Sequence, residues 1–154
     1  MGFRLILVGR TERGHVADGL DYYLARIRRM EPVDDTVVAE AGRRDPAWQR
    51  RTESERILAA LRLGEKVVAL DERGSLLSSP DFAAQLGKWR DQGTRHTAFI
   101  IGGAYGLTDE VRQRADLVLS LSPMVFPHQL VRVLFAEQLY RALSILKGSG
   151  YHHG

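Results

Sequence analysis

The sequence predicts an α/β fold: a single domain with a mostly parallel β-sheet and helices on both of its faces. Three observations carry this prediction. The length of 154 residues suits one domain. Apolar runs of strand length alternate with helical stretches, and this alternation favours a parallel sheet covered by helices. Hydrophobic residues make up 44% and charged residues 27% of the chain, which is typical of a globular protein rather than a disordered one.

Five runs rich in Val, Ile, Leu and Phe are expected to form the strands. They cover residues 3–8, 36–41, 66–70, 97–101 and 117–121. Helices are expected between them, and proline marks two of their starts, because Asp45-Pro46 and Ser79-Pro80 each place a capping residue before a proline. Thr108, followed by two acidic residues, marks a third start. The loosest segment before the tail is expected at residues 72–75.

The final helix, expected over residues 127–147, is apolar around most of its circumference. Val131 and Leu134 lie on one face, whereas Val133 and Tyr140 extend the apolar surface to the next. A helix of this kind must be covered on more than one side. In so short a chain, the second cover is expected to be another copy of the chain, so we predict a twofold homodimer. The alternative is a helix buried in one large core.

Two of the expected strands end in residues that continue neither a strand nor a helix. The run 97–101 leads into two glycines at 102 and 103, and the run 117–121 leads into Ser122-Pro123. Ligands of open α/β sheets bind beyond the carboxyl ends of the strands, where main-chain groups are left free. With the strand end at Leu70, these two ends predict a ligand pocket. The glycine spacing matches neither a dinucleotide fingerprint nor a P-loop, and a simple tight turn is the alternative.

The composition narrows the possible chemistry. The chain has no cysteine, which excludes disulfides, thiolate nucleophiles and cysteine-based metal sites, so no structural metal is expected. The net charge is +3, and nineteen of the 22 basic residues are arginines, which suit phosphate recognition. Local clusters occur at Arg26, Arg28 and Arg29, and at Arg43, Arg44, Arg50 and Arg51. The alternative to phosphate recognition is that these arginines lie on solvated helix faces.

No long uncharged apolar run or leader is apparent, so we expect a cytoplasmic protein without a membrane segment.

Polar residues near the predicted pocket offer candidates for catalysis. His128 and Arg132 lie four residues apart at the start of the final helix and could contact a phosphate or a substrate carbonyl. The alternative is structural: His128 could bond a loop carbonyl, and Arg132 could bind an Asp or Glu across the sheet. The tail carries His152 and His153, whose adjacent positions suit a single metal ion poorly. A glycine-flanked tail of this kind could order over a substrate, or it could be a frayed terminus.

Several blocks of the chain resemble the ribosomal RNA large subunit methyltransferase H family of the SPOUT superfamily. The resemblance runs nearly end to end and is carried by these blocks: Ile101-Gly102-Gly103-Ala104-Tyr105-Gly106-Leu107, Leu121-Ser122-Pro123-Met124-Val125-Phe126-Pro127-His128, Arg132-Val133, Glu137-Gln138-Leu139-Tyr140-Arg141-Ala142 and Tyr151-His152. It implies one methyltransferase domain over residues 1–154, with a trefoil knot in its C-terminal part and a homodimeric assembly.

The resemblance also implies an activity and a site. The activity is methyl transfer from S-adenosylmethionine to N3 of a pseudouridine in the intersubunit stem-loop of 23S rRNA, on assembled 70S ribosomes. The implied cofactor-binding residues are Leu70, Gly102, Leu121, Ser122, Pro123, Met124, Val125 and Phe126. They coincide with the strand ends and the turn identified above. Family members commonly carry Arg or Lys after the terminal Tyr-His, whereas this chain has His153 there.

The acceptor nitrogen in such a reaction must lose a proton, and the charge that develops on its carbonyls favours a nearby donor or cation. The candidates are His128, Arg132, Tyr151, His152 and His153, with the tail residues reaching across a dimer; the base is not assigned among them. A non-catalytic α/β module that binds an adenine nucleotide or associates with the ribosome is the competing interpretation. A hydrolase is disfavoured because no nucleophile motif is present.

Overall fold

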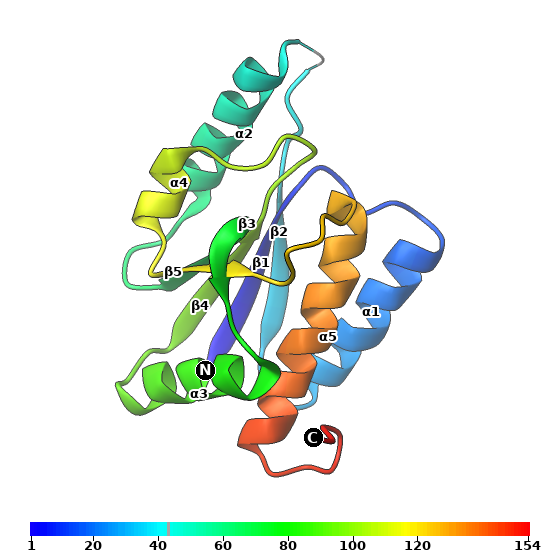
Figure 1. The fold of residues 1–154 in the computed structure, drawn as a ribbon, viewed down its shortest axis with the longest axis vertical. Helices are drawn as coiled ribbons and strands as arrows, with labels where there is room; N and C mark the ends of the chain where they lie inside the picture. The colour runs from blue at the N-terminus through cyan, green and yellow to red at the C-terminus, as the bar shows by residue number, and fades with distance from the viewer. Residues whose placement is uncertain (43) are drawn as a thin grey trace.

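The computed structural model describes residues 1–42 and 44–154; Arg43, named above in an arginine cluster, lies outside them. Ten elements alternate along the chain (Figure 1). The strands are β1 (Gly2–Val8), β2 (Val33–Val38), β3 (Lys66–Leu76), β4 (His96–Ile101) and β5 (Leu117–Ser120). The helices are α1 (His15–Arg28), α2 (Pro46–Ala60), α3 (Ser79–Asp91), α4 (Asp109–Arg114) and α5 (His128–Leu146).

The five strands form one sheet in the order β2-β1-β4-β3-β5, and every pair in it is parallel. The predicted α/β class and the parallel sheet are therefore confirmed. The carboxyl ends of all strands meet at one edge of the sheet, as parallel pairing requires. In this edge β4 and β5 lie on either side of β3, so the segments that follow β3, β4 and β5 converge there.

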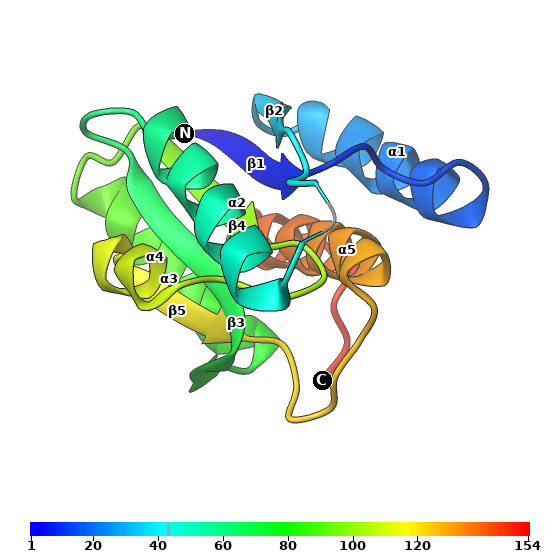
Figure 2. The ribbon, with the colours of Figure 1, turned by 90° about the horizontal axis from the view of Figure 1, so that it is seen from above.

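Helices cover both faces of the sheet (Figure 2). Along β1, alternate side chains enter two separate cores: Leu5 and Leu7 join the core with α1, α3 and α5, while Ile6 and Val8 join the core with α2 and α4. Because both faces are buried, the central strands are apolar at successive positions rather than at alternate ones. This is why strand-length apolar runs were a sufficient signal for β1, β3 and β4.

Two strands differ from their predicted bounds by more than one residue. The second strand begins at Val33 and ends at Val38, three residues earlier than the predicted run 36–41, because its register pairs Phe3 with Val33 and Val8 with Val38. Residues 39–41 therefore extend beyond the end of β1. The prediction that 72–75 is a loose segment was wrong, since these residues lie within β3.

The extension of β3 depends on an irregularity in its pairing with β5. The register shifts between Leu70 and Ser75, after which Ser75 and Leu76 pair with Leu119 and Ser120. Gly74 lies so close to β5 that a Cβ atom there would be 2.5 Å from the carbonyl oxygen of Val118. The chain can bulge and remain paired because glycine leaves this space free.

The helix caps follow the predicted pattern with one shift. Asp45 caps α2 by accepting the Trp48 N–H at 2.9 Å. Helix α3 is capped by Ser78, one residue before the predicted Ser79, through a bond from the Asp81 N–H at 3.1 Å. Thr108 is the N-cap of α4 but its side chain makes no capping bond.

The final helix packs beside α1 (Figure 1) and against α3. Its fully buried apolar residues are Phe135, Ala136, Leu139, Ala142 and Leu143, whereas Val131 and Leu134 are only half-buried. A second apolar stripe therefore stays partly open in the single chain. This partial exposure is what the predicted homodimer would cover.

Candidate functional site

A cavity of about 970 Å³ lies at the carboxyl edge of the sheet, where β3, β4 and β5 end and α5 begins. Its walls come from residues 70–73 within β3, from the segments that follow β4 and β5, and from the first turn of α5. Pockets that take drug-sized or cofactor-sized ligands have volumes of a few hundred to about a thousand Å³. The cavity is therefore large enough for a nucleoside-bearing ligand.

The residues predicted to bind the cofactor come together in this cavity. Leu70 of β3, Gly102 after β4 and Met124 after β5 all line it. The strand end predicted at Leu70 is wrong, because β3 continues to Leu76. The other predicted cofactor residues that line it are Leu121, Ser122, Val125 and Phe126. Pro123 is exposed and is not among the lining residues.

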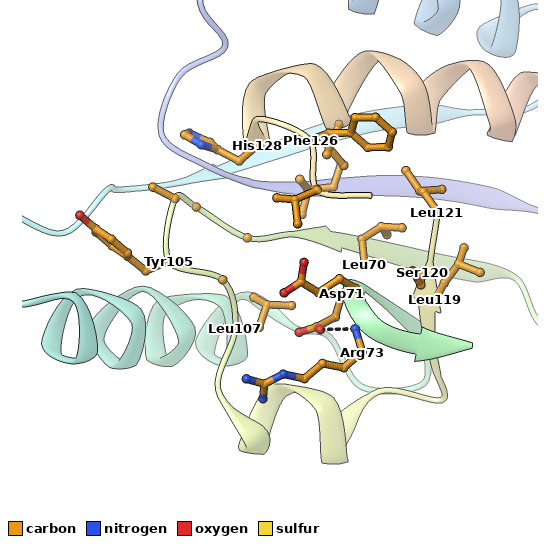
Figure 3. Close-up of a pocket in the computed structure, with 18 of the residues that line it drawn as sticks. Leu70, Asp71, Arg73, Tyr105, Leu107, Leu119, Ser120, Leu121, Phe126 and His128 are labelled. Atoms are coloured by element: carbon orange, nitrogen blue, oxygen red, sulfur yellow. Dashed lines mark hydrogen bonds between the residues drawn. The ribbon is translucent and has the colours of Figure 1, made fainter. Parts of the chain in front are cut away.

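The labelled side chains show a partial separation of apolar from polar groups along the cavity, although Ser120 lies among the leucines and Leu107 on the side of Tyr105 (Figure 3). Leu119, Leu121 and Phe126 gather toward one end, with Leu70 beside them, while Tyr105 and His128 lie toward the other. This separation suits a ligand with a flat apolar part and a polar, reactive part. Tyr105 was not among the predicted site residues, although its position between two glycines of the loop is visible in the sequence.

The turn between β5 and α5 is held by serine hydroxyls rather than by regular backbone pairing. The Ser120 hydroxyl donates to the Ser122 carbonyl at 3.1 Å, and the Ser122 hydroxyl accepts the Met124 N–H at 3.0 Å. The side chains of Met124 and Val125 are 75% and 77% exposed, which is high for such apolar residues. Their exposure marks this turn as a surface for a ligand or a partner.

The glycine loop, defined here as residues 102–107, forms the wall after β4. A Cβ atom on Gly102 would meet the Leu107 side chain at 3.0 Å, so a larger residue here would crowd the loop itself. Arg112 of α4 donates to the Leu107 carbonyl at 2.8 Å and to the Asp71 carboxylate at 2.9 Å. Arg112 thereby ties the glycine loop to the end of β3.

Arg112 also bonds to Asp109 in the first turn of α4. That hydrogen bond and charge lower the pKa of Asp109, and the bonds to Asp109 and Asp71 raise the pKa of Arg112 against the opposing effect of its burial. Arg50 and Arg73, which both line the cavity, contribute further to the lowered pKa of Asp109. The α4 side of the cavity therefore holds fixed charges of both signs.

His128 and Arg132 take different positions although they are four residues apart. His128 lines the cavity, whereas Arg132 is fully buried and does not line it. The Arg132 guanidinium donates to the carbonyls of Val8 at 2.6 Å and Gly9 at 3.0 Å, and to the Thr11 hydroxyl at 2.9 Å. Arg132 therefore holds the loop after β1, as the structural alternative for this residue anticipated, although with carbonyls rather than carboxylates as partners.

Gln129 belongs to the same arrangement and was missed at the level of sequence. Its side chain accepts the Glu12 N–H at 2.9 Å and donates to the Arg10 carbonyl at 3.1 Å. Burial lowers the pKa of Arg132, with partial compensation from Glu12 and other acids. The first turn of α5 thus fixes the β1–α1 loop beside the cavity.

The C-terminal tail folds back onto the last turns of α5 and does not line the large cavity. Arg141 forms a paired contact with Glu137 at 3.0 Å and lies 3.0 Å from His152 Nδ1. The Tyr151 hydroxyl donates to Glu137 at 3.3 Å, and burial, followed by the Glu137 charge, raises the pKa of Tyr151 to about 12. His153 is exposed.

The tail and the large cavity lie at opposite ends of α5. His128 and Arg141 are thirteen residues apart, which corresponds to roughly 20 Å along a helix. A smaller cavity of about 480 Å³ shares residues 119–122 with the large one and reaches Glu137. Tyr151, His152 and His153 are therefore not brought to the large cavity of their own chain.

The described residues, 1–42 and 44–154, contain neither a candidate membrane span nor a candidate metal site. No helix in this part of the chain combines the length and apolar character needed to cross a bilayer. Within the same ranges, no three His, Cys, Asp or Glu side chains gather in a way that could hold a metal ion.

The comparisons with known proteins agree over the length of the chain. A family model described as predicted SPOUT methyltransferase matches residues 1–152. The ribosomal RNA large subunit methyltransferase H of Geobacter sp. (strain M21) is 42% identical over 153 residues, covering 99% of each chain. The protein of the same name from Rhodospirillum centenum is 46% identical over 149 residues, covering 96% of each.

Solved structures resemble the chain in fold at low sequence identity. A probable methylase family protein from Haemophilus influenzae has a TM-score of 0.57 at 12% identity, covering 99% of this chain and 70% of that one. A Legionella pneumophila protein solved with bound SAM has a TM-score of 0.50 at 14% identity, covering 96% of this chain and 66% of that one. The likeness supports the knotted SPOUT fold expected for the C-terminal part.

Proposed function

Because this chain belongs to the SPOUT methyltransferase family, we propose that it is an S-adenosylmethionine-dependent methyltransferase acting on ribosomal RNA. The observation that carries the proposal is the convergence of the predicted cofactor residues on one cavity at the carboxyl edge of the sheet. Relatives of more than 40% identity over nearly the full chain are named ribosomal RNA large subunit methyltransferase H, which supports the substrate class.

The cavity fits the cofactor on three counts. Its volume suits an adenosine derivative, Leu119, Leu121 and Phe126 offer apolar walls for the adenine, and the turn after β5 supplies main-chain groups for its edge. When bound, S-adenosylmethionine supplies a methyl group activated by its sulfonium. We propose that Leu70, Gly102 and the turn 121–126 hold it, with Pro123 contributing through the shape of the turn rather than as a wall.

The chain's own residues have two tasks in the reaction. The first is to hold the acceptor in line with the donor, and positioning of this kind corresponds to effective molarities of about 10⁵–10⁸ M, against about 10²–10⁴-fold for a general base. The second is to accept or relay the acceptor's proton and to stabilise the negative charge that develops. His128 is the predicted catalytic residue that lines the cavity, and this supports the proposal that it contacts the acceptor.

We further propose that the enzyme acts as a homodimer whose tail serves the partner's site. The half-buried stripe of α5 and the exposed Met124 and Val125 offer an apolar surface for a second copy. Tyr151 and His152 do not line the cavity of their own chain, and the Tyr151 hydroxyl is bonded to Glu137, which lies about 14 Å along the helix from His128. We therefore assign their candidate catalytic roles to another subunit's cavity. Arg132 is retained only as a support for the β1–α1 loop.

The specific target proposed is N3 of a pseudouridine in the intersubunit stem-loop of 23S rRNA, on assembled 70S ribosomes in the cytoplasm. The described residues form one α/β domain without a separate RNA-binding module among them, and this favours a large pre-shaped substrate. Arg50 and Arg73, at the cavity, are suited to phosphate contacts, and binding should weaken as salt rises. Methylation of 70S ribosomes should therefore be much faster than that of naked RNA, and equal rates would contradict this part of the proposal.

Two experiments test the activity. Mass-spectrometric mapping of methylated nucleosides in ribosomes from a deletion strain, with and without the restored gene, should reveal one modification that depends on this protein. Calorimetry with S-adenosylmethionine, S-adenosylhomocysteine and ATP separates the proposal from a non-catalytic nucleotide-binding module. The methyltransferase should bind the first two ligands, whereas preference for ATP would favour the module.

A further inference from the structure

Glu53 of α2 is a buried carboxylate beneath the glycine loop. Only 1% of the residue is exposed. Its Oε2 atom accepts the Ala41 N–H at 3.0 Å and the Gln49 side-chain amide at 3.3 Å. Its Oε1 atom is also buried, but among the described residues it has no hydrogen-bond partner. A buried carboxylate oxygen without a donor is costly, so a specific use for it should be sought.

The unpaired oxygen faces the glycine loop. A Cβ atom on Gly103 would lie 2.7 Å from Oε1, so only a glycine lets the main chain approach the carboxylate this closely. The N–H of Gly106 is paired with the Gly103 carbonyl at 3.1 Å. Gly103 also forms an antiparallel bridge with Gly106, whereas for the N–H of Ala104 no acceptor is found within the described ranges. An unpaired donor and an unpaired acceptor therefore lie in neighbouring segments.

The neighbouring residue on α2 already holds the other end of the loop. The Ser54 hydroxyl accepts the Thr108 N–H at 3.1 Å, and Ser54 is as deeply buried as Glu53. Neither residue lines the cavity, so both can influence a ligand only through the loop. Helix α2 thus presents two adjacent polar side chains to the loop. Ser54 is hydrogen-bonded to it, whereas the Oε1 atom of Glu53 has no partner among the described residues.

We propose that Glu53 is a positioning residue for the glycine loop, whose Oε1 accepts a main-chain N–H of the Gly103–Ala104 segment when the loop closes on the cofactor. With Ser54 at Thr108, α2 then fixes both ends of the loop. The inference rests on the proposed cofactor function of the cavity. It adds to that function a buried residue that touches neither cofactor nor substrate.

The variant Glu53→Gln tests the role of the free oxygen with little change in shape. The Ala41 N–H requires an acceptor at the Oε2 position, so the glutamine must direct its oxygen there and its NH₂ group toward Gly103. The acceptor that faces the loop is then replaced by a donor. Because the variant also removes an unpaired buried charge, we expect the free protein to melt at the wild-type temperature or above it.

Binding is expected to change in the opposite direction. The affinity for S-adenosylmethionine, measured by calorimetry, should fall about tenfold in Glu53→Gln. In the complex, amide hydrogen exchange at Gly103 or Ala104 should be slow in the wild type and fast in the variant. Raised or unchanged stability with weaker binding is a combination that a merely structural carboxylate would not produce.

Matched variants complete the test. Glu65 is another buried carboxylate, paired with Arg4 at the opposite end of β3, so Glu65→Gln should lower the melting temperature without changing cofactor affinity. Ser54→Ala should weaken binding, whereas Ser144→Ala, at an equally buried serine bonded within α5, should not. Wild-type affinity in Glu53→Gln, or equal exchange of the two amides in both complexes, would overturn the inference alone. Failure of the wild type to bind S-adenosylmethionine would overturn the proposed function and the inference with it.

Discussion

Gly74 provides the sharpest test of the fold around the cavity, because the atoms it approaches belong to the backbone. In Gly74→Ala the new Cβ would lie 2.5 Å from the Val118 oxygen, 2.6 Å from the Val118 carbonyl carbon and 2.8 Å from the Leu119 nitrogen. Backbone atoms of a paired strand cannot rotate away as a side chain can. The two strands must therefore separate by about 0.9 Å to restore ordinary van der Waals contact.

The expected cost follows from what this separation disrupts. Overpacking alone typically costs about 1–3 kcal/mol. The pairs that follow the bulge, Ser75 with Leu119 and Leu76 with Ser120, are weakened as well, at roughly 0.5–1.5 kcal/mol for each hydrogen bond lost. We expect the free energy of unfolding to fall by about 2–4 kcal/mol and the melting temperature by roughly 4–16 °C. Leu119 lines the cavity, so cofactor affinity should fall about tenfold as well.

Urea denaturation and calorimetry at fixed protein concentration measure these two effects. Gly42→Ala is the matched control, because a Cβ there would have no neighbour within 4 Å and the backbone is not in the left-handed region. Its stability should stay within about 0.5 kcal/mol of the wild type. If Gly74→Ala behaved like this control, the close approach of β3 to β5 would not be a real constraint on the fold.

Three further predictions address the supports of the cavity and the tail. Arg132→Lys keeps the charge but loses the planar fork that bonds Val8 and Gly9. Urea denaturation should show that the free energy of unfolding falls by about 2–4 kcal/mol. Wild-type stability would refute the anchoring role. Arg112→Met should cost about 2–3 kcal/mol and weaken cofactor binding, and unchanged affinity would show that the Leu107 contact does not set the loop. Tyr151 should titrate near pH 12 by ultraviolet absorbance. Since its pKa is raised, its contribution to stability is present below about pH 10 and is lost as pH rises through 12. An ordinary pKa would contradict its burial beside Glu137.

The sequence was most informative where burial on both faces made the strands continuously apolar. Local patterns predicted the strands near residues 3–8, 66–70 and 97–101 and the proline-marked start of α2. They also predicted that the segments around Leu70, Gly102 and Ser122 converge. The extension of β3 through 71–76 was not predictable. Its polar residues read as a loop, and the pairing that keeps them in a strand is made with a segment more than forty residues away.

The supports of the site were hidden for a related reason. Arg132 has the helical spacing that places it near His128, but its long side chain reaches the carbonyl ends of β1, more than 120 residues earlier in the sequence. The buried face of α2 includes Gln49 and Glu53, so hydrophobic periodicity points away from it. The glycine at 103 was a visible signal, yet only the fold reveals that it makes room for a carboxylate as well as for a ligand.

The contact between the first and last helices governs when the domain can form. Helix α5 packs beside α1, and its Arg132 and Gln129 secure the loop that joins β1 to α1. The core around β1 and α1 is therefore completed only when α5 is in place. Such long-range pairing is slow compared with local contacts. During synthesis, these contacts can form only after α5 has left the ribosome.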